Sequence, residues 1–92
     1  MKEKLWRVEI EPEVARELER IRAEEPRGTS AVEGFIHFVS RAPASGFAIL
    51  RDDPDVRSRP LHTAVAAYVV IYEFNQDVVT CIGIRKIPYS TY

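Results

Sequence analysis

The side chains best able to do chemistry are cations and phenols in the last part of the chain. From position 56 onward there are four cations and only two carboxylates. The cations are Arg57, Arg59, Arg85 and Lys86. Tyr89 and Tyr92 follow in the C-terminal segment. Guanidinium, ammonium and phenol groups together would fit a phosphate-bearing partner or an acidic protein surface.

Metal and thiol chemistry is not expected. A single cysteine, Cys81, excludes an intramolecular disulfide and cannot supply a cysteine-based metal site. Only His37 and His62 could join it, so we predict no metal and no cofactor. The acidic run at residues 52–55 contains a proline, and such a composition is typical of a turn.

Size and charge narrow the class of protein. Ninety-two residues with 46% hydrophobic and 29% charged side chains predict one globular domain, residues 1–92. A net charge of −1 argues against general nucleic-acid binding, which depends on phosphate contacts. We find no membrane-spanning run and no signal-peptide pattern, so we expect a cytoplasmic protein without a membrane partner.

Two apolar runs rich in Val, Ile and Tyr predict the centre of an antiparallel sheet. They cover residues 68–74 and 78–84, and a polar turn at 75–77 joins them. Shorter strands are expected at 6–10, 47–51 and 56–63. Within the last of these, Pro60 indicates an edge or bulge position, because proline cannot donate to a ladder.

Two helices are expected between the first strand and the rest. Pro12 opens a helix that extends to about residue 25, and its apolar stripe contains Val14, Leu18 and Ile21. Residues 26–28 end that helix, and a capping-box pattern at residues 30–33 predicts the start of a second helix that ends near residue 41.

The predicted fold is α+β: an N-terminal strand, an antiparallel helical hairpin, and a twisted antiparallel sheet of three to four strands. One sheet face packs on the helices and the other stays partly open. The expected helix residues are Leu18, Ile21, Phe35 and Val39, and the expected sheet residues are Val70, Tyr72, Val79 or Cys81.

The element order and several local strings resemble the RelE/ParE superfamily, the toxin halves of bacterial type II toxin–antitoxin pairs. The likeness spans nearly the whole chain. The matching segments are residues 6–10 with Pro12 and the helix after it, 57–61, 68–73, and 79–84 followed by Arg85 and Lys86.

The resemblance implies one of two activities. RelE-like members cut mRNA in the ribosome and use the neighbouring 2′-hydroxyl as nucleophile, whereas ParE-like members poison DNA gyrase. In both groups a cognate antitoxin folds onto the toxin. We expect RelE-like mRNA cleavage first, and the alternatives are a ParE-like gyrase poison or an inactive homologue that only binds its antitoxin.

The resemblance also assigns roles to residues. Arg59, Arg85 and a tail tyrosine, Tyr92 or else Tyr89, would be catalytic. Arg57, Lys86 and Arg51 would bind flanking phosphates. Because such catalysis needs its groups around one phosphate, we expect Arg59 and Arg85 to converge in the fold.

Several features leave other interpretations open. Asp52, Asp53 and Asp55 would repel RNA, and Arg59 could brace Asp53 or Asp55 instead of binding phosphate. The tail tyrosines could simply cover the end of the sheet. We also expect an exposed apolar groove for the antitoxin, because a sheet with one helical layer leaves apolar surface uncovered.

Overall fold

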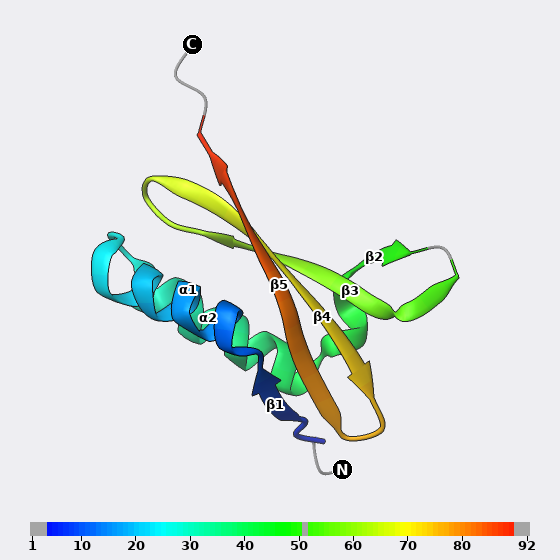
Figure 1. The fold of residues 1–92 in the computed structure, drawn as a ribbon. Coiled ribbons are helices and arrows are strands. Elements are labelled where there is room, and N and C mark those ends of the chain that lie inside the picture. The colour runs from blue at the N-terminus through cyan, green and yellow to red at the C-terminus, as the bar shows by residue number, and fades with distance from the viewer. Residues whose placement is uncertain (1–3, 51, 90–92) are drawn as a thin grey trace.

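The computed structural model describes residues 4–50 and 52–89, and Figure 1 shows two helices packed against a twisted sheet. The chain begins with β1 (Arg7–Ile10), followed by the helices α1 (Pro12–Glu24) and α2 (Gly28–Arg41). A short 3₁₀ turn (Pro43–Ser45) then leads into β2 (Phe47–Leu50), β3 (Asp53–His62), β4 (Ala66–Asn75) and β5 (Val78–Pro88). The predicted α+β class is confirmed.

The N-terminal strand β1 joins the four C-terminal strands in one sheet. Its order is β1-β5-β4-β3-β2, in which β2 to β5 pair antiparallel, as predicted. β1 pairs parallel with β5, so the sheet is five-stranded and mixed rather than antiparallel throughout. Val8 and Ile10 of β1 pack against the core, which explains why this short strand covers part of the edge of β5.

Both helices cover one face of the sheet (Figure 1). Each buries an apolar stripe against that face. The stripe of α1 consists of Val14, Leu18 and Ile21, and α2 buries Val32, Phe35 and Val39. The predicted contacts are confirmed, since all eight expected residues belong to one core cluster with less than 4% of their surface exposed.

The start of α2 differs from the prediction. The helix begins at Gly28, so Ser30 lies inside its first turn and the predicted capping box is wrong. Arg27 occupies the cap position in the left-handed conformation, with φ 64°, and no side chain caps the helix. Close packing decides this start, because a Cβ at Gly28 would overlap the carbonyl of Ile21 in α1.

The strand ends also differ from the predicted ones. β3 begins at Asp53, within the segment expected to be a turn, and β5 continues to Pro88 because the start of β4 pairs with it there. Arg85 and Lys86 therefore lie within a strand. Pro60 sits beyond the paired part of β2, which reaches only Ser58, so its expected edge position is confirmed.

The two glycines of α2 provide a matched test of the helical hairpin. Gly28→Ala should lower the free energy of unfolding by more than about 1 kcal/mol, because the added methyl overlaps the backbone of α1. Gly34→Ala meets nothing within 4 Å, so it should raise that free energy by roughly 0.5–1 kcal/mol through helix propensity. Urea denaturation measures both, and equal effects of the same sign would contradict the packing described.

Candidate functional site

The pairing of the strands decides which side chains can act together. In β4 the fully buried residues Tyr68, Val70 and Tyr72 face the helices, and the intervening Val69 and Ile71 face the other way. Residues directly opposite each other in paired strands share a face. A site residue in β3 or β5 therefore lies on the same face, helix face or open face, as the β4 residue opposite it.

Arg57 and Arg59 lie on the helix face. Arg59 pairs with Val70, and its guanidinium carbon stacks 3.8 Å from the centre of the Phe38 ring of α2. Arg57 pairs with Tyr72 and donates hydrogen bonds to the carbonyls of Pro54, at 2.7 Å, and Gly46, at 3.3 Å. Neither arginine forms an ion pair with Asp53 or Asp55 among the described residues, and the contacts of the two side chains are with the Phe38 ring and with backbone carbonyls.

Arg85 lies on the open face, opposite Val69. A bulge in β5 sets this orientation, because Cys81 and Gly83 pair with successive residues of β4 and leave Ile82 as an extra residue. Arg85 is exposed, and none of the ion pairs between described residues includes it. Arg59 and Arg85 thus point to opposite sides of the sheet, and their expected convergence is wrong.

Of the other predicted site residues, the structure describes Lys86 and Tyr89, and each contacts a nearby group. Lys86 pairs with Tyr68 on the helix face, and its Nζ lies 4.0 Å from Oε1 of Glu25. The Tyr89 hydroxyl donates to the carbonyl of Thr63 at 3.0 Å, which ties it to the β3–β4 turn. Arg51 and Tyr92 lie outside the described residues.

On the helix side, several charged side chains are hydrogen-bonded to one another or to Tyr68. Arg20 donates to Glu17 and to the Tyr68 hydroxyl, and Tyr68 donates in turn to Glu25 at 3.0 Å. The hydrogen bond from Arg20 lowers the pKa of Glu17, and burial raises the pKa of Tyr68. Burial also raises the pKa of Cys81 to about 12, so this thiol is a core side chain and a poor nucleophile.

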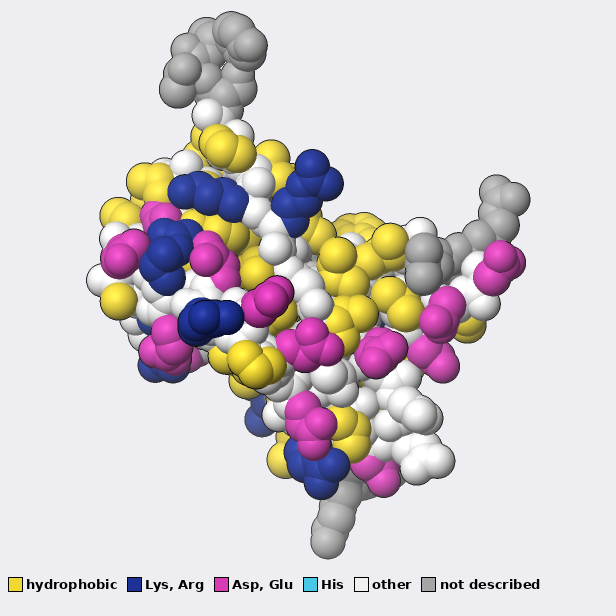
Figure 2. Space-filling view, viewed as in Figure 1, with side chains coloured by type: hydrophobic (Ala, Val, Ile, Leu, Met, Phe, Trp, Pro, Cys, Tyr) yellow, Lys and Arg dark blue, Asp and Glu magenta, His cyan; other side chains and the backbone are white. Residues whose placement is uncertain are grey.

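An apolar groove of about 560 Å³ runs over the open face. This open-face groove is lined by Ile49, Ser58, Val69, Ile71, Arg85, Lys86, Ile87 and Pro88. Ile49 is 44% exposed and Ile87 is 48% exposed, although both are large hydrophobic side chains. In Figure 2 hydrophobic side chains gather over this part of the molecule, and carboxylates border them.

Most groove residues were missed by reasoning from the sequence. The signal was present in residues 68–72, which are apolar on both faces and not only at alternate positions. Such a run is typical of a strand covered on both sides. Here the helices cover only one side, so the expected exposed apolar groove is confirmed as a feature of the fold.

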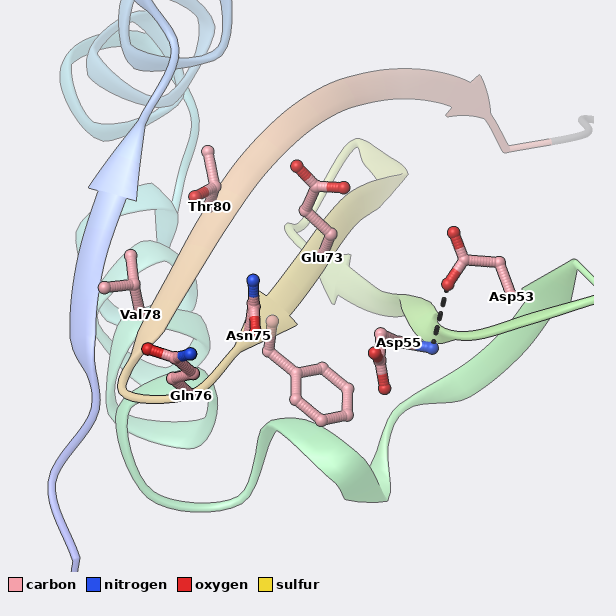
Figure 3. Close-up of a pocket in the computed structure, with 8 residues that line it drawn as sticks. Asp53, Asp55, Glu73, Asn75, Gln76, Val78 and Thr80 are labelled. Carbon is pink, nitrogen blue, oxygen red and sulfur yellow. Dashed lines mark hydrogen bonds between the residues drawn. The ribbon is translucent and has the colours of Figure 1, made fainter.

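A second hollow, of about 500 Å³, lies toward the β4–β5 turn (Figure 3). Its carboxylates are Asp53, Asp55 and Glu73, and Oδ1 of Asp53 accepts a hydrogen bond from the Asp55 backbone N–H at 3.2 Å. Within residues 4–50 and 52–89, no group of three or more acidic, histidine or cysteine side chains could hold a metal ion. Glu73 shares the open face with Arg85, so this face is acidic toward one end and cationic toward the other.

Comparison with protein-family models, curated proteins and solved structures finds no match to this chain. The likeness to RelE/ParE toxins therefore stays an interpretation of its residues and element order. Of the helices that the structure describes, none has the length and apolar character needed to cross a membrane.

The two key arginines should differ in their effect on stability. Arg59→Ala removes the stacking on Phe38 and should lower the free energy of unfolding by about 0.5–1 kcal/mol. Arg85→Ala removes an exposed side chain and should change it by less than about 0.5 kcal/mol. Urea unfolding at neutral pH measures both variants. A larger loss for Arg85→Ala would contradict the assignment of the two faces.

The network around Arg20 predicts a dependence of stability on pH. The pKa of Glu17 is lower in the folded protein, so its contribution is present above the unfolded pKa of about 4.3 and is lost as the pH falls through the folded value. Glu17→Gln should therefore flatten the fall of the urea midpoint between pH 6 and pH 3. Glu33→Gln is the control, because the Glu33 carboxylate is 66% exposed and lies 3.8 Å from Arg22, so this variant should change the slope less than Glu17→Gln does. Equal slopes in all three proteins would remove this role of Glu17.

Proposed function

We propose that this chain is a toxin-type protein of the RelE/ParE kind that acts by binding a protein target, and that its open-face groove receives an antitoxin segment. The observation that carries the proposal is the apolar groove on the uncovered sheet face, with the exposed guanidinium of Arg85 on its rim. A small monomeric protein rarely leaves such a surface open without a partner.

The groove has the chemistry of a peptide-binding surface. Ile49, Val69 and Ile87 provide apolar contacts, and Arg85 provides one cation that no described carboxylate neutralises. A segment with apolar side chains and a carboxylate would bury the first and pair with the second. An antitoxin arm that folds on binding supplies such a segment.

Protein binding is favoured over RNA cleavage by the positions of the cations. Cleavage through a 2′-hydroxyl needs a base, an acid and cations around a single phosphate. On the helix face Arg57 donates to backbone carbonyls and Arg59 stacks on Phe38, while Arg85 lies on the open face. The carboxylates of the hollow in Figure 3 would repel a phosphate chain that crosses the open face. We therefore favour a protein that poisons DNA gyrase by binding it over the mRNA endoribonuclease that the sequence led us to expect first.

Purified protein can separate the two activities. We expect inhibition of supercoiling by DNA gyrase, with no cleavage of mRNA on translating ribosomes as measured by primer extension. Ribosome-dependent cleavage that disappears in Arg85→Ala would overturn the binding mechanism. Absence of both effects at saturating protein would overturn the assignment as a toxin.

The groove itself is tested with the product of the adjacent reading frame, co-expressed with this chain. Ile49→Asp places a charge in the groove and should weaken the complex at least tenfold, as measured by titration calorimetry. Leu5→Asp is the matched control, because Leu5 is 63% exposed and lies before β1, away from the groove. Circular dichroism checks that both variants fold. Equal affinities for both variants, or no complex with the wild type, would contradict the proposed surface.

A further inference from the structure

β5 has an uncovered edge along its second half. β1 pairs only with Val78–Cys81 of β5, and the last contact on this side is the Glu11 N–H to the Cys81 carbonyl, at 3.1 Å. β4 pairs with the opposite side of β5 as far as Pro88. Among the described residues no strand lies beside residues 82–88 on the side away from β4, so alternate backbone N–H and C=O groups there lack a ladder partner.

A groove of about 410 Å³ follows this edge where α1 begins. This edge groove is lined by Glu13, Val14, Glu17, Ile82, Gly83, Ile84 and Lys86. Glu17 is already paired with Arg20, whereas Glu13 is exposed and none of the described ion pairs includes it. On the helix side the uncovered backbone is flanked by the available carboxylate of Glu13 and by Lys86, whose Nζ lies 4.0 Å from Oε1 of Glu25. Arg85 flanks it on the open side.

We infer that a partner segment adds to the sheet as a sixth strand beside residues 82–88 of β5. This inference rests on the proposed function, because the segment is the part of the antitoxin that continues from the open-face groove. Its backbone would complete the ladder that β1 leaves unfinished. Its side chains would alternate between the two faces.

The charges of β5 specify the side chains of this segment. On the open face, the position opposite Arg85 takes a carboxylate. On the helix face, the position opposite Ile84, on the side away from Lys86, faces the edge groove, where Glu13 favours a lysine or arginine. An acidic residue beside a basic one, within an otherwise apolar or threonine-rich strand, is the sequence pattern that this edge selects.

A second copy of this chain fits the edge less well. Two β5 strands related by a two-fold axis through the sheet pair antiparallel, and a register centred on Arg85 or Lys86 places that cation opposite itself. In a register centred on Ile84, the second β5 strand would have to lie beside the first turn of α1, where the side chains of Glu13 and Val14 already line the groove. The unpaired charges of Arg85 and Glu13 favour a different chain with the stated charges as the occupant.

Strand addition is tested with synthetic peptides and the whole protein. The probe is a blocked heptapeptide of valine and threonine with a central glutamate and an adjacent lysine, labelled for fluorescence anisotropy. Two further peptides carry N-methyl groups, one at the odd and the other at the even backbone amides. Because only alternate amides face β5, one methylated peptide should bind at least tenfold more weakly than the parent and the other should bind like the parent. Hydrogen exchange should slow at backbone amides within residues 82–88 when the parent peptide is present.

A charge exchange provides the control for register. Arg85→Glu should weaken binding of the parent peptide at least tenfold, and a peptide with lysine in place of the central glutamate should recover the loss. Equal binding by both methylated peptides, or no binding of the parent, would overturn strand addition. That result would leave the supercoiling assay and the Ile49→Asp comparison unaffected, because neither depends on the edge of β5.

Discussion

Burial of one face of β4 against the two helices is the constraint from which the other features follow. Tyr68, Val70 and Tyr72 expose none of their surface, and the hydroxyls of both tyrosines are hydrogen-bonded. Once these three side chains face the helices, the alternation of a strand assigns every neighbouring residue to a face. Slipping one residue would expose the tyrosines and bury Glu73, which the free energy of burial forbids.

The bulge in β5 changes which residues of that strand face the helices. Before it, Val79 and Cys81 face the helices; after it, Ile84 and Lys86 do so. One extra residue, Ile82, thus turns Arg85 outward to the open face. The same change places Lys86 near the carboxylates of α1 and its connection to α2, where Glu25 partly neutralises it. The chemistry at this end of the molecule depends on a single local irregularity.

The open face, the edge of β5 and the acidic hollow together form a surface with apolar side chains and charges of both signs. Apolar side chains lie in its middle, Arg85 lies near one end, and carboxylates lie at the other end. Such an arrangement can orient a bound segment through charge while gaining affinity from apolar contact. On the helix face the guanidinium groups of Arg57 and Arg59 are already engaged, the first with backbone carbonyls and the second with the Phe38 ring.

The α+β class, the two helices, and the core residues of both helices and of β4 could be derived from the sequence, because hydrophobic periodicity reports burial directly. The sequence also indicated the open apolar surface. It could not show that β1 joins β5, since pairing between distant segments leaves no local signal. Nor could it show that α2 starts at Gly28, where close packing on α1 outweighs the capping pattern at Ser30.

The types of the candidate residues were determined by the sequence, but their grouping was decided only by the tertiary structure. Arg59 and Arg85 are 26 positions apart, and nothing in their neighbourhoods records the face on which each would lie. That outcome depends on the register of three strands and on one bulge, which are set by packing across the whole core. The sequence therefore supplied a set of cations, and the fold divided them between a packed face and a face open to partners.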